Sequence, residues 1–159
     1  MDDNTIVVFT SDHGETMASQ FEDPKNSPYT ESMNVPFLIR YPGKLKPQVN
    51  DVLLGTPDIM PTLLSLAGLE KEIPTSVQGQ SLMPFLKEKS CKRDAPKGVL
   101  YLRNVDGEKD AAGKVQSYFP IARGIKTQQY TMAITIDKKK QVKEILLFDD
   151  KKDPYQMQP

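Results

Sequence analysis

The stretch Thr5–Glu15, with the sequence TIVVFTSDHGE, decides how the first half of the chain is interpreted. Its residues from Thr5 to Thr10 are all apolar or β-branched, a pattern typical of a strand covered on both faces of a sheet. The run ends at Asp12, at His13, which is the only histidine of the chain, and at Gly14. In open parallel sheets, ligands bind at the carboxyl ends of the strands. The stretch therefore predicts a buried strand with a candidate site at its end.

The residues that follow extend an α/β pattern. Val35–Tyr41 predicts a second buried strand, and Thr56–Leu69 predicts a helix that ends at Gly68. Asp58 is expected to cap this helix, which places Pro61 in its first turn, where the missing N–H costs nothing. The apolar face of the helix is expected to consist of Ile59, Leu63, Leu66 and Ala67.

The second half of the chain has a different pattern, which begins after the charged segment Lys87–Lys97. Short strands separated by turns are predicted at Gly98–Arg103, Phe119–Ile125, Tyr130–Asp137 and Lys143–Phe148. The last two strands read as an antiparallel hairpin with a lysine-rich tip. We therefore expect an α/β fold with α+β character overall, in which residues 1–90 form an α/β domain and residues 91–159 a small antiparallel β subdomain.

The composition argues against some classes of partner and some kinds of site. The 159 residues include 21 Lys plus Arg and 21 Asp plus Glu, and this zero net charge argues against nucleic acid or an anionic membrane as the main partner. The apolar runs stay far below the roughly 20 residues of a membrane-spanning helix. Cys91 is the only cysteine, which excludes an internal disulfide and a cysteine-based zinc cluster.

Several segments together resemble a known family. They are VVFTSDHGE with Lys25 four residues before Tyr29, ESMNVPFLIRYPG, TPDIMPTLLSLAGL, QGQSLMPFL and LLFDDKKDPYQM. In this order they resemble the C-terminal part of a sulfatase, a sulfuric ester hydrolase of the alkaline phosphatase superfamily. The resemblance implies the C-terminal part of an alkaline-phosphatase-like α/β sheet, followed by a small antiparallel β subdomain, in an enzyme that hydrolyses sulfate esters.

The resemblance gives Asp12 and His13 the role of metal ligands. They match a pair that binds a divalent cation, usually calcium, beside the nucleophile. A carboxylate suits a hard cation, whereas the imidazole of His13 suits manganese or zinc better, so these two metals remain alternatives. The structural alternative is a turn in which Asp12 caps a short helix over Glu15–Phe21. Gly14 is expected to supply a positive φ.

Lys25 matches the lysine that this family uses in catalysis. The resemblance implies that its ammonium reaches the sulfate group and neutralises charge in the transition state. Family members usually have glycine where Pro24 stands, and Glu directly after the tyrosine, where this chain has Thr30. The structural alternative for Lys25 is a solvated loop side chain, and Tyr29 is expected to pack rather than to catalyse.

The family's nucleophile has no counterpart in the chain. Sulfatases use a formylglycine made from Cys or Ser in a C/S-x-P-x-R motif, whereas Cys91 is followed by Lys-Arg-Asp. We expect the formylglycine in a part of the protein outside these residues, and no hydrolysis of sulfate esters by the chain alone. Two alternatives stay open: a phosphodiesterase or phosphonate hydrolase of the same superfamily, and a non-catalytic structural or binding module.

The remaining expectations concern partners and location. The resemblance implies a sulfated small molecule or glycan as substrate, and a parent protein that is periplasmic, extracellular or lysosomal. Apolar surface left uncovered in this segment makes self-association an expectation as well.

Overall fold

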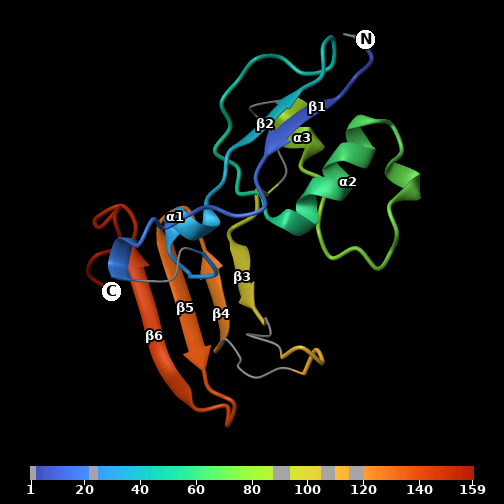
Figure 1. Ribbon diagram of the computed structural model, residues 1–159. Helices are drawn as coiled ribbons and strands as arrows, with labels where there is room; N and C mark the ends of the chain where they lie inside the picture. Colours follow the sequence, from blue (N-terminus) through green and yellow to red (C-terminus); the bar gives the residue numbers. More distant parts are fainter. Residues whose placement is uncertain (1–2, 22–24, 88–93, 105–109, 115–119) are drawn as a thin grey trace. The chain divides into compact units, whose positions relative to one another are not determined.

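The computed structural model describes residues 3–21, 25–87, 94–104, 110–114 and 120–159 (Figure 1). These residues group into two compact units: unit 1 is Met1–Ser11 with Pro36–Val99, and unit 2 is Asp12–Val35 with Leu100–Pro159. The segment 12–35 belongs to unit 2 through contacts such as the hydrogen bond from the Thr30 N–H to Gln156 Oε1, at 2.7 Å. The two units are each made of two separate chain segments, whereas the predicted domains 1–90 and 91–159 are divided at one position. That domain division stays a prediction.

The first two strands lie in unit 1. β1 (Val7–Thr10) pairs antiparallel with β2 (Phe37–Arg40), with Val7 opposite Arg40, in a two-stranded sheet. Both strands lie where the sequence predicts them, but the expected burial on two faces is wrong. Val7 is 49%, Phe9 64% and Leu38 59% exposed. An apolar run indicates that a strand can be covered on both faces, but the covering elements must come from elsewhere in the fold. Among the described residues of unit 1, β1 has only one neighbouring strand.

The helix predicted for Thr56–Leu69 is α2 (Thr56–Leu66), and Gly68 follows it at φ 79°. Its N-cap is Gly55 rather than Asp58. Asp58 instead lies in the first turn, where its Oδ2 accepts the N–H of Gly55 at 2.9 Å and places a negative charge at the positive end of the helix dipole. Because the helix begins this early, Pro61 lies inside it and not in the first turn, which corrects the prediction.

The buried face of α2 is rotated from the predicted one. Its buried residues are Pro61, Thr62, Ser65 and Leu66, whereas Ala67 is exposed. Thr62 explains part of this rotation, because its Oγ1 donates to the Asp58 carbonyl at 2.6 Å and accepts the N–H of Leu82 at 2.9 Å. Leu82 is fully buried and precedes the short helix α3 (Met83–Lys87). A 3-10 turn, η2 (Glu70–Glu72), lies between the two helices. None of the helices in the described ranges has the length and apolar character needed to cross a bilayer.

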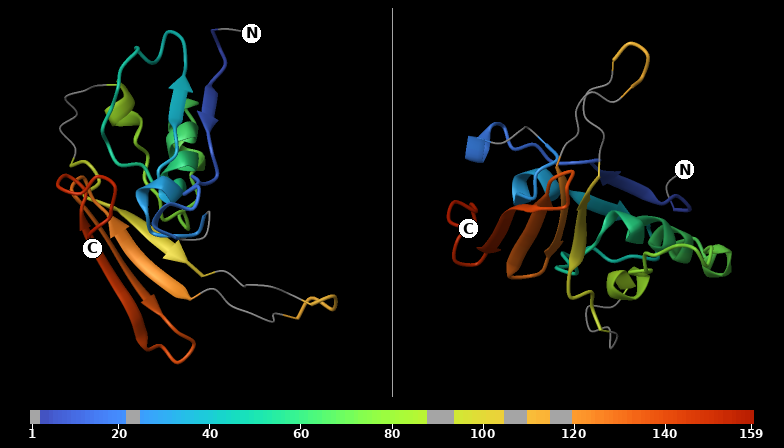
Figure 2. Two further views of the ribbon diagram at one scale, coloured as in Figure 1. Left: turned by 60° about the vertical axis from the view of Figure 1, so that its left-hand side comes forward. Right: turned by 90° about the horizontal axis from the view of Figure 1, so that it is seen from below.

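The main element of unit 2 is a four-stranded sheet in the order β3-β4-β5-β6, and the strands lie side by side in Figures 1 and 2. The strands are β3 (Val99–Arg103), β4 (Ile121–Lys126), β5 (Tyr130–Ile136) and β6 (Val142–Asp149). β5 pairs antiparallel with both β4 and β6. The predicted antiparallel sheet is therefore confirmed, including the hairpin whose tip lies at Asp137–Gln141. Phe119, the predicted start of β4, lies outside the described residues.

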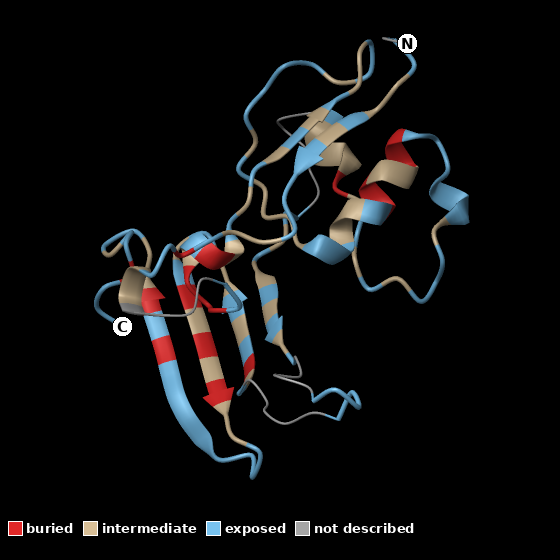
Figure 3. Ribbon diagram, in the orientation of Figure 1, coloured by how far each residue is buried: buried red, intermediate tan, exposed pale blue. Residues whose placement is uncertain are grey.

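The sheet of unit 2 buries one face. Leu146 and Phe148 of β6 cluster with Tyr29, and the rings of Tyr29 and Phe148 lie 5.7 Å apart. The other face carries exposed apolar side chains, among them Leu102 at 63% and Ile145 at 60% exposure. Figure 3 shows buried residues alternating with partly buried ones along β5, whereas in β6 buried residues alternate with more exposed ones only from Leu146 onward. The period-2 pattern of these strands thus sets which face covers the core.

The prediction of a short helix over Glu15–Phe21 is wrong except for its last residues. Only a 3-10 turn, η1 (Ser19–Phe21), forms there. Met17, Ala18 and Gln20 have φ values of 51°, 67° and 54°, which an α-helix cannot contain. This conformation is stabilised by tertiary contacts rather than by local helix propensity. In one of them the Gln20 side chain donates to the carbonyl of Tyr155 at 2.9 Å.

Candidate functional site

Gly14 fixes the Asp12–Gly14 segment against α1 (Thr30–Met33). Its N–H donates to the carbonyl of Ser32 at 2.8 Å, and a Cβ at this position would lie 2.0 Å from the carbonyl oxygen of Glu31. Any side chain would therefore collide with the backbone of α1. The predicted positive φ is wrong for Gly14. Close backbone approach, and not a left-handed conformation, is what requires glycine here.

His13 is held in one orientation by the backbone beside it. Its Nδ1 lies 2.7 Å from the carbonyl oxygen of Gly14, and in a neutral imidazole this contact requires the proton on Nδ1. Nε2 then carries the lone pair, and it lies 3.5 Å from Oδ2 of Asp12. The other carboxylate oxygen of Asp12 accepts the N–H of His13 at 3.0 Å. An imidazole lone pair and a carboxylate oxygen thus lie side by side.

Lys25 completes this group, because its Nζ lies 3.4 Å from Nε2 of His13. The structure thereby brings together Asp12, His13 and Lys25, the three residues that the sequence singled out. Their roles as ligands and catalyst stay predictions. The carboxylate of Asp12 is 84% exposed and the ring of His13 38% exposed, so both are open to a ligand from outside.

The donor set of Asp12 and His13 fits part of a divalent cation site. A ligating histidine typically donates its second ring N–H to a backbone carbonyl or carboxylate, as Nδ1 of His13 does to Gly14. In the portions of the chain that the structure describes, no cluster of three or more His, Cys, Asp or Glu could hold a metal ion. Asp12 and His13 can therefore supply two ligands, and a complete coordination sphere needs others.

The backbone after Lys25 takes an uncommon conformation. Asn26 has φ 65°, and its carbonyl oxygen accepts hydrogen bonds from Tyr101 Oη and Arg103 Nη1, both at 2.8 Å. Ser27 follows and is buried, with 1% of its surface exposed. Neither Tyr101 nor Arg103 carries a local sequence signal for this contact, because each lies more than 70 positions from Asn26. Pro24, the departure from the family pattern, and Cys91 lie outside the described residues.

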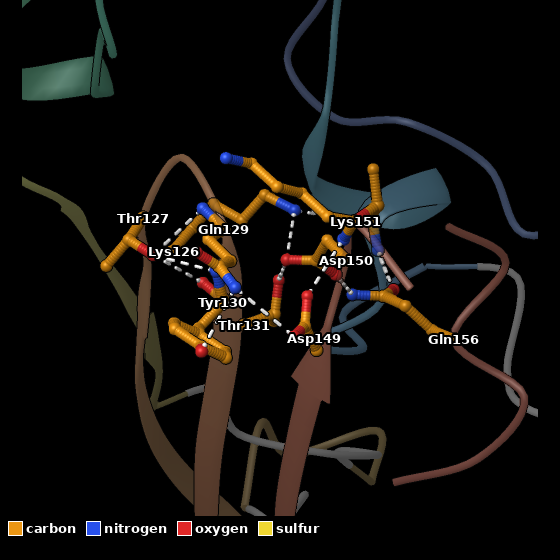
Figure 4. A network of polar contacts seen from close by, with 10 residues as sticks. Lys126, Thr127, Gln129, Tyr130, Thr131, Asp149, Asp150, Lys151 and Gln156 are labelled. Carbon is orange, nitrogen blue, oxygen red and sulfur yellow. Dashed lines mark hydrogen bonds and ion pairs between the residues drawn. The ribbon is translucent and has the colours of Figure 1, made fainter. Parts of the chain in front are cut away.

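A network of polar side chains anchors α1 to the sheet of unit 2 (Figure 4). Its centre is Asp150, whose carboxylate accepts hydrogen bonds from Lys126 Nζ at 2.9 Å, Thr131 Oγ1 at 2.7 Å and Gln156 Nε2 at 2.7 Å. Lys126 also donates to Oγ1 of Thr30, and Gln156 accepts the Thr30 N–H. The first residue of α1 is thus held by two members of the network, and Gly14 docks on the same helix.

Comparison with known proteins identifies the family. The model of the family described as N-sulphoglucosamine sulphohydrolase, C-terminal, matches residues 21–159. The chain belongs to this sulfatase family. Its predicted resemblance to the C-terminal portion of a sulfatase is confirmed.

Curated relatives of this sulfatase segment are themselves named sulfatases. The chain is 58% identical over 159 residues to an endo-4-O-sulfatase of Bacteroides thetaiotaomicron, covering 99% of this chain and 31% of that protein. It is 36% identical over 168 residues to an ulvan-active sulfatase of Formosa agariphila, covering 98% of this chain and 28% of that protein. The sulfatase segment thus spans about a third of the length of these relatives.

Solved structures confirm the fold of the sulfatase segment. A structure from a study of glycosaminoglycan metabolism by Bacteroides thetaiotaomicron has a TM-score of 0.88 at 58% identity, covering 99% of this chain and 33% of that one. A second protein, solved in complex with its substrate D-glucosamine-2-N,6-O-disulfate, has a TM-score of 0.78 at 30% identity, covering 98% of this chain and 29% of that one. The mixed α/β fold class with an antiparallel β part is therefore confirmed.

Proposed function

We propose that the full-length protein containing this segment hydrolyses sulfate esters of sulfated glycans or small sulfated molecules. One observation carries the proposal: in a chain of the sulfatase family, the Nε2 atom of His13 lies 3.5 Å from Asp12 Oδ2 and 3.4 Å from Lys25 Nζ. Relatives support the substrate class, since one is named an endo-4-O-sulfatase and another was solved with a sulfated glucosamine as its substrate.

In this proposal Asp12 and His13 bind one divalent cation. Calcium is the first choice because of the carboxylate, and manganese or zinc are the alternatives because of the imidazole. When bound there, a divalent cation would supply positive charge that offsets the negative charge of the sulfate group. A formylglycine outside this chain supplies the nucleophile, as the family resemblance implies.

Lys25 then neutralises charge on the sulfate group. Its ammonium now donates to the lone pair of His13 Nε2, which is the same lone pair that a cation would use. If His13 held a cation through this lone pair, the ammonium of Lys25 would lose this acceptor and could donate to sulfate oxygens instead. Gly14 and α1 hold the two ligands in place through the Ser32 carbonyl.

The proposal extends to location and association. We propose the periplasm, the outside of the cell or a lysosome as the location of the full-length protein, by analogy with the family. Exposed apolar residues of the sheet in unit 2, such as Leu102 and Ile145, support self-association of the isolated segment.

The metal role can be tested in the full-length protein. Asp12→Ala and His13→Ala should each lower the affinity for the divalent cation by more than the roughly ten- to hundredfold that loss of a ligand's hydrogen-bond partner costs, and excess cation should restore part of the sulfate release. Metal content is measured by elemental analysis after dialysis, and sulfate release with an aryl sulfate. Full metal occupancy in both variants would show that other residues hold the cation. A wild-type protein that releases no sulfate from aryl or glycan substrates would contradict the proposed activity itself.

A further inference from the structure

Two side chains of β3 hold the backbone next to Lys25. The carbonyl oxygen of Asn26 accepts a hydrogen bond from the phenol of Tyr101 and another from the guanidinium of Arg103, both at 2.8 Å. A carbonyl oxygen has two lone pairs, so this pair of donors satisfies it fully, and the bond from Arg103 is charge-assisted. We call these two hydrogen bonds the Asn26 clamp.

The clamp acts on a residue in a left-handed conformation. Asn26 has φ 65°, which non-glycine residues adopt rarely and which persists when the surroundings impose it. On one side of Asn26 lies Lys25 with an exposed side chain, and on the other lies Ser27, which is buried. The chain therefore changes direction at Asn26, and the clamp holds the carbonyl of the Asn26–Ser27 peptide at this change of direction, one residue beyond Lys25.

Arg103 is itself held in place by its surroundings. Its Nε donates to the carbonyl of Pro120 at 2.9 Å, and its own carbonyl accepts a hydrogen bond from Arg123 Nη1 at 3.1 Å. A guanidinium with two of its nitrogens bound to fixed carbonyls has little freedom to turn. The clamp thus connects the backbone beside Lys25 to β3 and β4 rather than to a loose surface side chain.

We propose that Tyr101 and Arg103 are positioning residues for Lys25. Their side chains hold the carbonyl of the peptide between Asn26 and Ser27, and they restrain the backbone one residue beyond Lys25. This inference rests on the proposed function of Lys25 as the cation that contacts the sulfate group. Small misplacements of a catalytic group can cost up to about a hundredfold in rate, so loss of one clamp bond should be measurable.

The kinetic test uses the full-length protein and a double-mutant cycle. Tyr101→Phe removes the donor and keeps the ring, and it should lower the turnover number about tenfold. In a Lys25→Ala background the same substitution should change turnover by less than about twofold, because the group that it positions is already gone. The matched control is Tyr155→Phe, which removes the hydroxyl of a tyrosine that is 75% exposed, and it should leave turnover unchanged.

A second measurement does not depend on activity. Hydrogen exchange of the peptide that contains Lys25–Tyr29, followed by mass spectrometry in the full-length protein, should become several-fold faster in Tyr101→Phe and stay unchanged in Tyr155→Phe. Unchanged exchange in Tyr101→Phe would overturn the clamp, whether or not the protein is a sulfatase.

The kinetic outcomes separate this inference from the proposed function. An equal loss of turnover from Tyr101→Phe with and without Lys25 would show a general structural effect and would overturn the positioning role. A large loss from Lys25→Ala with none from Tyr101→Phe would overturn the positioning role alone. Wild-type turnover in Lys25→Ala would overturn both the catalytic role of Lys25 and the inference built on it.

Discussion

Replacing Asp150 with alanine should destabilise unit 2 by about 3 kcal/mol. Its carboxylate accepts three hydrogen bonds of 2.7 to 2.9 Å, and one of them comes from the ammonium of Lys126. The side chain of Asp150 is 14% exposed and that of Lys126 is 24% exposed, so the variant leaves a largely buried ammonium without its counter-charge. Partial exposure places the cost at the lower end of the range for a broken buried ion pair.

Lys152→Ala is the matched control for this prediction. Lys152 also pairs with an aspartate, Asp149, but at 3.7 Å and with 84% of its side chain exposed. Such a surface pair contributes no more than about 1 kcal/mol. Urea unfolding followed by circular dichroism, with linear extrapolation, gives both values. An Asp150→Ala protein no less stable than Lys152→Ala would refute the view that this network anchors α1.

Three further predictions follow from particular contacts. Gly14→Ala should cost about 1–3 kcal/mol, because its Cβ would lie 2.0 Å from the Glu31 carbonyl oxygen, and the same urea assay measures it. The pKa of Asp137 lies below its ordinary value of 3.8, chiefly because the backbone N–H of Gln141 donates to the carboxylate. The ionised carboxylate therefore stabilises the fold at pH values above 3.8, and this contribution is lost as the pH falls through the lowered pKa. Asp137→Asn should therefore destabilise the protein at pH 7 and lose this effect at pH values below the lowered pKa of Asp137, as acid titration of both proteins would show. The 159-residue chain alone should release no sulfate from an aryl sulfate. Sulfate release by this chain that is lost in the Asp12→Ala variant would contradict this prediction.

Local patterns in the sequence predict the sheet of unit 2 well. Buried residues alternate with less buried ones along β5 and along the C-terminal half of β6, and the polar tip Asp137–Gln141 marks the turn between the strands. Both signals therefore lie within a short window of the sequence. The exposure of Phe9 in β1 is not predictable in this way. An apolar run indicates that a strand can be covered, but the covering layers come from elsewhere in the fold.

The candidate site shows the same division between local and distant information. Asp12 and His13 are adjacent in sequence, and the family resemblance adds Lys25, so the sequence by itself is enough to name all three residues. The Asn26 clamp joins Asn26 to Tyr101 and Arg103 across 75 and 77 positions, and no local pattern marks either partner. Only tertiary structure reveals contacts of this kind.

The most direct test of the proposed function is the rate of sulfate release by Lys25→Ala in the full-length protein with its metal site saturated. Loss of one electrostatic contact to the transferring group costs about 3 kcal/mol, so the turnover number should fall by about a hundredfold or more while metal occupancy and unfolding midpoint stay at wild-type values. Turnover close to wild type, with the cation bound, would contradict the role of Lys25 and with it the assignment of this group of residues as part of a sulfatase active site.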